Sequence, residues 1–203
     1  MNIYNKFYLP TVYNIGFLGE GNYKPSLNGK RNKEYSLWQS MLQRCYDEKF
    51  NNRHIAYKDC IVDDEWLNFQ NFAEWFYSNY NPEYMEGWQL DKDLLCKNNK
   101  KYGKHTCCFL PQRLNKLLTK NDRVRGGYPI GVDYYKSKNK FRATISIDNR
   151  QRHIGYFKTS EEAFEAYKVE KEKEIKRLAN NYKKELTKEV YKALCNYKVE
   201  IND

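Results

Sequence analysis

Histidine, methionine and proline are scarce in this 203-residue sequence, which contains three, three and five of them. No stretch joins a basic start and a long apolar run to a small-residue cleavage site, so we expect no secretory leader. No apolar run has the length needed to cross a bilayer, and we therefore expect no membrane partner and a cytoplasmic location.

The six cysteines lack the paired spacing that zinc fingers use. No Cys-x-x-Cys occurs, although His54 and His105 lie near cysteines in the sequence. Cysteines of a cytoplasmic chain are expected to be reduced thiols. Burial in the core is the simpler interpretation, and zinc binding is the alternative left open.

Aromatic and basic residues, by contrast, are abundant. Aromatics make up 16% of the chain, with 19 tyrosines, and the net charge is +10. Residues 123–160 carry nine Lys or Arg against two Asp, a balance of +7, whereas residues 1–122 carry seventeen basic against fourteen acidic residues. A basic field concentrated in one segment attracts polyanions, so nucleic acid is the expected partner.

Residues 131–167 have the pattern of three short strands followed by one helix. Residues 140–147 alternate apolar with basic or hydroxylated side chains, which is the period of a strand with one buried face. Asp148 and Asn149 predict a tight turn into a strand that contains Gln151 and His153, and residues 132–136 predict a third strand. Thr159 and the acids after it predict a helix start. The helix has an apolar stripe to cover the sheet, formed by Ala163, Phe164, Ala166 and Tyr167.

In this stretch the chain resembles the ethylene-responsive-factor type of DNA-binding domain, which also occurs in phage proteins joined to HNH nucleases. The matching pieces are Gly131-Val132, Lys140-Phe141, Ile154-Gly155-Tyr156-Phe157 and Ser160-Glu161-Glu162-Ala163. The resemblance implies that the sheet, rather than the helix, enters the major groove. The DNA-facing positions of that family fall on Asp133, Tyr135, Lys140, Arg142, Thr144, Gln151 and His153.

We add the neighbouring basic residues Lys136, Lys138 and Arg150 as further DNA-binding candidates. The chain departs from the plant pattern, because Asp133 and Gln151 stand where arginines are usual and Phe141 replaces a tryptophan. The plant base preference is therefore not transferred.

The first half of the chain predicts helices with aromatic core stripes. Residues 1–33 indicate an irregular arm. Residues 34–46 place Trp38, Met41, Leu42 and Cys45 on one helical face, and residues 66–77 predict a second helix. The acids at 63–65 suit a helix N-terminus, with metal binding as the alternative.

Residues 88–118 predict a hairpin followed by a helix that begins near Pro111. This order resembles the HNH, or His-Me finger, nucleases of phage homing-type proteins. The matching residues are Leu90-Asp91-Lys92-Asp93, Asn99, Thr106-Cys107-Cys108-Phe109 and Gln112-Arg113-Leu114-Asn115.

In an active member of that family, a histidine beside the acid is the general base for water, and a divalent metal is bound nearby. Here Lys92 stands at the histidine position, and a protonated amine cannot accept that proton. The resemblance implies Asp91 and Lys92 as catalytic candidates, with the alternative that Lys92 only pairs with Asp91 or Asp93. His105, in the loop before the second strand, is a third candidate, with a solvated loop histidine as the alternative. The resemblance also implies Asp91, Asp93 and Asn99 as oxygen ligands of Mg²⁺ if the site is active. We expect the wild type to be inactive or very slow and Lys92→His to raise its activity.

The fold expected is α+β, in two parts. An HNH-like hairpin-helix domain with flanking helices covers residues 1–122, and residues 121–128 are the best linker. Residues 123–203 form a three-stranded antiparallel sheet packed on one helix, with a C-terminal helical extension. That extension either closes the core or meets a homodimer or protein partner through its apolar stripe of Leu186, Val190, Leu194 and Tyr197.

The function expected is a phage-type protein that reads duplex DNA on a degenerate HNH scaffold, in the host cytoplasm if the chain is phage-encoded. Two alternatives stay open. One is a metal-dependent nicking or homing endonuclease, and the other is an inhibitor of a host defence that acts by protein contact.

Overall fold

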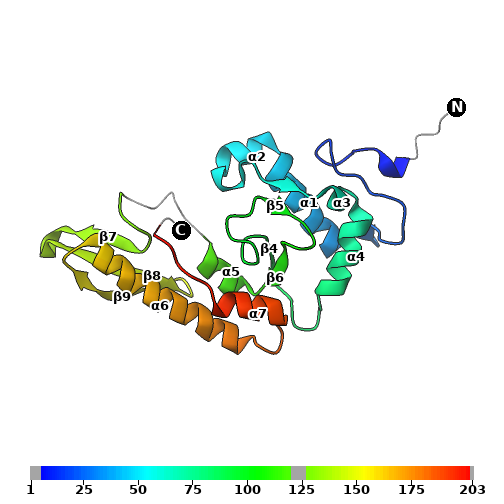
Figure 1. The fold of residues 1–203 in the computed structure, drawn as a ribbon. Coiled ribbons are helices and arrows are strands. Elements are labelled where there is room, and N and C mark those ends of the chain that lie inside the picture. The colour runs from blue at the N-terminus through cyan, green and yellow to red at the C-terminus, as the bar shows by residue number, and fades with distance from the viewer. Residues whose placement is uncertain (1–5, 120–126, 202–203) are drawn as a thin grey trace. The chain divides into compact units, whose positions relative to one another are not determined.

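The computed structural model describes residues 6–119 and 127–201, and its fold is α+β (Figure 1). It divides into two compact units, Met1–Phe109 and Leu110–Asp203. The division falls earlier than residue 122 because helix α5 (Gln112–Leu118) packs against α6 (Ser160–Asn181) of the second unit. Residues 121–126, most of the expected linker, lie outside the described residues.

The first unit combines helices with very short strands. Strands β1 and β2 pair antiparallel, β3 pairs with β5 in parallel, and β4 pairs with β6. The elements are α1 Lys33–Tyr46, α2 Glu48–Arg53, α3 Asp64–Leu67, α4 Phe69–Asn79, β1 Ser26–Leu27, β2 Lys30–Arg31, β3 Ile61–Val62, β4 Gln89–Asp91, β5 Lys101–Tyr102 and β6 Cys108–Leu110, with 3₁₀ turns at Lys6–Tyr8 and Ile55–Tyr57.

The core of this unit lies between α1 and α4. Trp38, Met41 and Leu42 of α1 are fully buried, as are Phe69 and Phe72 of α4. The ring N–H of Trp38 donates to the backbone oxygen of Trp66 over 2.7 Å, so the buried indole keeps its hydrogen bond. The predicted apolar stripe of residues 34–46 is therefore confirmed as core.

The helix predicted over residues 66–77 is wrong as a single element, because the chain breaks at Asn68 into α3 and α4. Phe17 of the N-terminal arm occupies the break. Its N–H donates to the Leu67 oxygen at 3.0 Å, and its oxygen accepts from the Phe69 N–H at 2.9 Å. The Asn68 side chain then caps α4 by accepting from the Gln70 N–H.

The acids at the start of α3 have the capping role that the sequence favoured. Asp63 accepts from the Glu65 N–H at 3.2 Å. The carboxylates of Asp63 and Glu65 also form ion pairs, with Lys101 and Lys104 respectively, each at 2.7 Å.

The second unit contains the three-stranded antiparallel sheet that the sequence predicts. The strand order is β7-β8-β9. Asp148 and Asn149 both have positive φ, at 51° and 62°, which is the backbone of the tight hairpin turn expected there. The elements are β7 Val132–Tyr135, β8 Lys140–Ile147, β9 Arg150–Phe157, α6 and α7 Lys188–Cys195, with a 3₁₀ turn at Lys136–Lys138.

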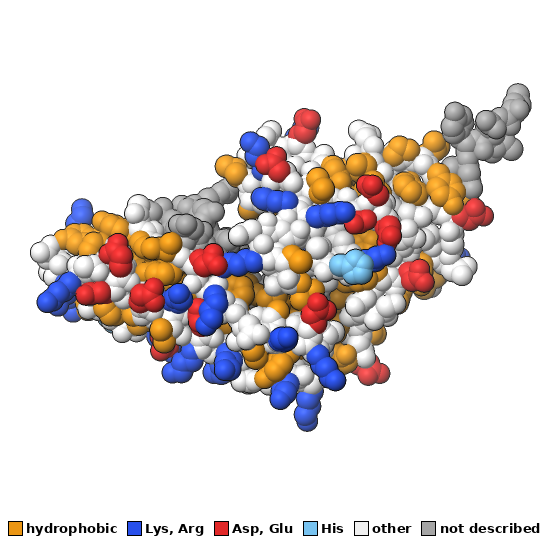
Figure 2. Space-filling model, viewed as in Figure 1, with side chains coloured by type: hydrophobic (Ala, Val, Ile, Leu, Met, Phe, Trp, Pro, Cys, Tyr) orange, Lys and Arg blue, Asp and Glu red, His pale blue; other side chains and the backbone are white. Residues whose placement is uncertain are grey.

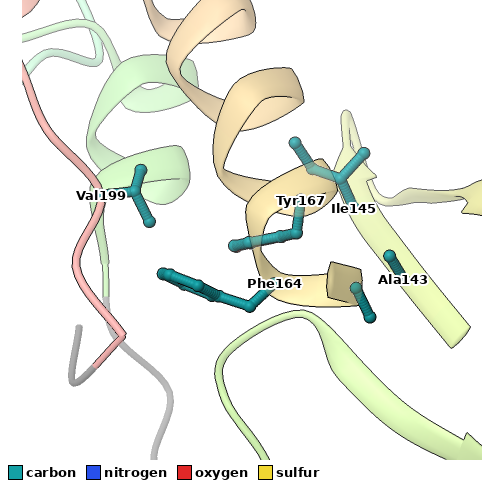
Figure 3. Close-up of a cluster of buried hydrophobic side chains, with 6 residues drawn as sticks. Ala143, Ile145, Phe164, Tyr167 and Val199 are labelled. Carbon is teal, nitrogen blue, oxygen red and sulfur yellow. The ribbon is translucent and has the colours of Figure 1, made fainter. Parts of the chain in front are cut away.

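Helix α6 covers one face of this sheet (Figure 3). Ala143 and Ile145 of β8 are buried together with Phe164 and Tyr167 of α6. The helix begins with the predicted cap, because the Thr159 hydroxyl accepts from the Glu162 N–H while the Glu162 carboxylate accepts from the Thr159 N–H. Because α6 covers this face, the opposite face of the sheet is the one left open to a ligand.

The C-terminal segment completes the core of the second unit. Val199 is fully buried. The Phe164 side chain extends from α6 toward the C-terminal segment that contains Val199 (Figure 3). The Val199 N–H donates to Glu172 at 3.0 Å, and Val190 and Leu194 of α7 are buried as well. The apolar stripe therefore packs within its own unit, which is the first of the two roles expected for it. Among the described helices, none has the length and apolar character needed to cross a bilayer.

Candidate nucleic-acid interface

The candidate interface is the face of the β7-β8-β9 sheet opposite α6, here called the open face. Strand alternation places its side chains away from buried Ala143 and Ile145. Its residues are Asp133, Tyr135, Lys140, Arg142, Thr144, Ser146, Gln151, His153 and Tyr156.

A β-bulge decides which β9 residues reach the open face. Ala143 is opposite Gly155, but the next residue, Thr144, is opposite His153, so Ile154 is the extra residue. The shift brings Tyr156 opposite Arg142 and onto the open face. Strict alternation from His153 misses Tyr156, and Gly155 inside the strand is the sequence signal typical of such a bulge.

Aromatic rings gather in the middle of the open face. The centroid of the Tyr156 ring lies 5.3 Å from that of Tyr135 and 4.5 Å from that of His153. The Lys138 amine lies over the Tyr156 ring, 3.9 Å from its centroid. The 3₁₀ turn thereby supplies a cation to the open face.

Arg142 is held by two neighbours on the same face. Its Nε and Nη2 groups donate to the two oxygens of Asp133 at 3.1 and 3.0 Å, and its guanidinium lies 4.8 Å from the centroid of the Tyr135 ring. The hydrogen bond to Asp133 raises the pKa of Arg142 further above its usual range. Beyond this pair, the Gln151 amide donates to the Thr144 hydroxyl at 3.3 Å, and Lys140 is exposed.

Arg150, a predicted DNA-binding residue, lies on the other side of the sheet. It is opposite Ile147 in the register, on the side that α6 covers. There it lines a hollow of about 570 Å³ together with Glu174 and Arg177 of α6. Arg152 lies on the same side and is paired with Glu170 at 2.6 Å. The basic residues of the segment therefore serve both sides of the sheet, and the open face has a smaller share than the +7 balance indicated.

The surface over α6 and α7 carries acidic and basic side chains side by side (Figure 2). Ion pairs within α6 account for part of this mixture, including Arg177 with Glu174 at 2.6 Å. A surface of paired charges attracts polyanions less than the open face does, where Lys138, Lys140 and Arg142 face a single acid, Asp133, among the described residues.

The predicted catalytic residue Lys92 is bound to other residues of its own loop. Its side chain is almost fully buried, and its amine donates to Asp93 at 2.6 Å and to the backbone oxygen of Asn99 at 2.7 Å. A buried ammonium needs such partners. Lys92 therefore links the two ends of the loop that follows β4.

The proposed magnesium ligands Asp91, Asp93 and Asn99 are turned toward their own loop. Asp91 Oδ1 accepts the N–H groups of Asp93 and Leu94 at 3.0 and 2.8 Å, directly after the end of β4. The Asn99 amide donates to the Lys92 oxygen, and its Oδ1 accepts the Lys101 N–H. With Asp93 holding the Lys92 amine, these residues do not fit a Mg²⁺ ion, which takes several oxygen ligands in octahedral geometry.

His105 is exposed in the loop between β5 and β6. Within the described residues, no hydrogen bond or ion pair joins it to Asp91 or Lys92, and no group of three or more His, Cys, Asp or Glu side chains is arranged to hold a metal.

The cysteines are all free, and four of the six are buried. Burial raises the pKa of Cys45 and of Cys107 to about 12, so both thiols stay protonated at neutral pH. Cys45 and Cys107 are therefore buried in the core as small apolar side chains.

Comparisons with protein-family models, with curated proteins and with solved structures found no match to this chain. The function is therefore inferred from the two candidate sites. The second is the segment of residues 89–110, called the β4–β6 hairpin because β4 pairs with β6 although β5 lies between them in the chain. The open face has accessible chemical groups, whereas Lys92 and Asn99 of the β4–β6 hairpin bind to each other's backbone.

Proposed function

We propose that the chain binds duplex DNA through the open face of its second unit. The observation that carries the proposal is the arrangement of Lys138, Lys140 and Arg142 around the paired rings of Tyr135 and Tyr156. Cations beside flat aromatic groups and amide or hydroxyl side chains are the chemistry with which proteins bind phosphates and base edges.

The dimensions of the sheet suit the major groove. Neighbouring strands lie about 4.8 Å apart, so the outer strands of a three-stranded sheet are separated by roughly 10 Å. The major groove of B-form DNA is about 12 Å wide and admits elements of that size. In this proposal, α6 stays outside the groove and supports the sheet from behind.

The roles of the side chains differ by their chemistry. Lys138 and Lys140 carry compact positive charges at one end of the sheet and are assigned to phosphates. Arg142 and Thr144 near the middle of β8, and Gln151 near the start of β9, have directed donors and acceptors and are assigned to base edges.

The β4–β6 hairpin is proposed to be a degenerate HNH scaffold that supports the first unit without nuclease activity. The hydrogen bonds of Lys92 and Asn99 within that hairpin favour a structural role. No specific observation favours a metal-dependent endonuclease or an inhibitor that acts by protein contact.

Lysine footprinting locates the bound DNA directly. The protein is treated with a limiting dose of an amine-acetylating reagent, with and without a random duplex, and each site is quantified by mass spectrometry. We expect the duplex to protect Lys138 and Lys140 but not Lys173 and Lys176, which are exposed on α6. Equal protection of the two pairs, or protection of the α6 pair alone, would contradict the proposal.

A further inference from the structure

Arg142 and Asp133 form a pair whose geometry leaves one edge of the guanidinium for a ligand. The two donors that Asp133 occupies, Nε–H and one Nη2–H, form the side edge of the arginine fork. The end edge, with one N–H on Nη1 and one on Nη2, keeps two parallel donors. Two parallel donors match the O6 and N7 acceptors of guanine in the major groove.

We propose that Arg142 reads a guanine and that Asp133 is a positioning residue that holds Arg142 for this contact. The inference rests on the proposed binding of duplex DNA to the open face. It goes further by assigning one base and one reading residue to that face.

The surroundings of Arg142 restrict its movement. Asp133 lies directly across the sheet on β7, and the Tyr135 ring supports the guanidinium at 4.8 Å. The side chain of Arg142 is nevertheless 31% exposed and that of Asp133 45% exposed, so the pair is accessible from the open face. An arginine fixed in this way loses little conformational entropy when it binds a planar partner.

The charge of the pair favours specificity over general affinity. Asp133 largely cancels the charge of Arg142 at a distance, so the pair adds little to the attraction of phosphates. An acid on a DNA-binding face repels every duplex equally. A gain that offsets this repulsion must come from particular base sequences, which is the role assigned to Arg142.

The test is selection from a randomised duplex library with the full chain, followed by affinity measurements on the enriched site. We expect the site to contain a guanine whose replacement weakens wild-type binding by about 5- to 150-fold. Arg142→Lys keeps the charge but loses the fork. It should therefore lose discrimination at that position while the salt dependence of binding stays unchanged.

Asp133→Ala should weaken the same discrimination and raise affinity for random duplex, because it removes a negative charge and frees the guanidinium. Glu170→Ala is the matched control. It removes the acid partner of Arg152 on the α6 side of the sheet and should change neither quantity. Thermal unfolding of each variant checks that the fold is kept.

The outcomes separate the inference from the proposed function. An unchanged enriched site for Arg142→Lys, or a wild-type site without a guanine preference, overturns the assignment of Arg142 while leaving DNA binding in place. Absence of salt-dependent duplex binding by the wild type overturns the proposed function, and the guanine assignment with it.

Discussion

The amine of Lys138, in the 3₁₀ turn, lies 3.9 Å from the centroid of the Tyr156 ring, near the end of β9. Tyr156 reaches the open face because of the bulge at Ile154. The contact joins the 3₁₀ turn after β7 to the last residues of β9. It makes Tyr156 the central ring of the open face, between Tyr135 and His153.

Tyr156→Ala should weaken duplex binding. The change removes the ring that holds Lys138, a contact of about 0.5–1 kcal/mol at an exposed site, so we expect a loss of roughly two- to fivefold in affinity. Tyr156→Phe keeps the ring and should bind like the wild type. Fluorescence anisotropy with a labelled duplex measures both, and equal affinity for the Ala and Phe variants would refute a role for the ring.

Gly131→Ala should destabilise the second unit. Gly131 has φ +76°, and an added methyl group would meet the ring of Tyr167 in the core. Left-handed strain and overpacking together should cost about 2–5 kcal/mol.

Gly127→Ala is the control for that change, because an added methyl group there has no neighbour within 4 Å and no positive φ is involved. Chemical denaturation followed by circular dichroism compares the two variants. Similar unfolding midpoints would mean that Tyr167 moves aside at little cost.

The sequence predicted the second unit well because its signals are local. The Asp148-Asn149 turn, the alternation in β8 and the Thr159 cap each depend on neighbours in the chain, and all three are confirmed. The position of Tyr156 was missed because a bulge depends on packing between strands rather than on alternation within one strand.

The first unit was predicted less well because long-range contacts decide its details. Phe17 breaks the expected helix at Asn68 from about fifty positions away, and β3 pairs with β5 across a similar separation. The candidate hairpin site shows the same limit. Residue types at 91–99 resemble a metal site, but only the structure shows that their polar groups are bound to the loop backbone.

Asp91→Asn should stabilise the first unit increasingly as pH rises. Burial raises the pKa of Asp91, so the native state holds this proton to a higher pH than the unfolded chain does. The resulting stabilisation is present below the unfolded pKa, about 3.9, and is lost as pH rises through the folded pKa. Asparagine retains an acceptor for the Asp93 and Leu94 N–H groups without that loss.

The measurement is the free energy of unfolding of wild type and Asp91→Asn between acid and neutral pH, with Asp59→Asn as a control at an exposed position. The difference between Asp91→Asn and wild type should grow with pH and then level off. A difference that is constant, or that shrinks with rising pH, would show that folding does not raise the pKa of Asp91.

Plasmid nicking should be absent in the wild type with Mg²⁺, Mn²⁺ or EDTA. The sequence alone predicts a gain for Lys92→His, but the hydrogen bonds of Asp91 and Asn99 lead us to expect that this variant stays inactive too. Supercoiled-plasmid relaxation compares wild type, Lys92→His and Asp91→Ala. Metal-dependent nicking by wild type that is lost in Asp91→Ala would make the endonuclease interpretation the correct one.

The salt dependence of duplex binding tests the central claim most directly. Each phosphate neutralised contributes about 0.9 to the slope of log K against log salt concentration. Lys138→Gln/Lys140→Gln removes two charges from the open face, and Lys173→Gln/Lys176→Gln removes two from α6. We predict that the first double variant lowers the slope by about 1.8 and that the second leaves it unchanged. An unchanged slope for the open-face variant, or an equal fall for both, would contradict DNA binding by this face of the sheet.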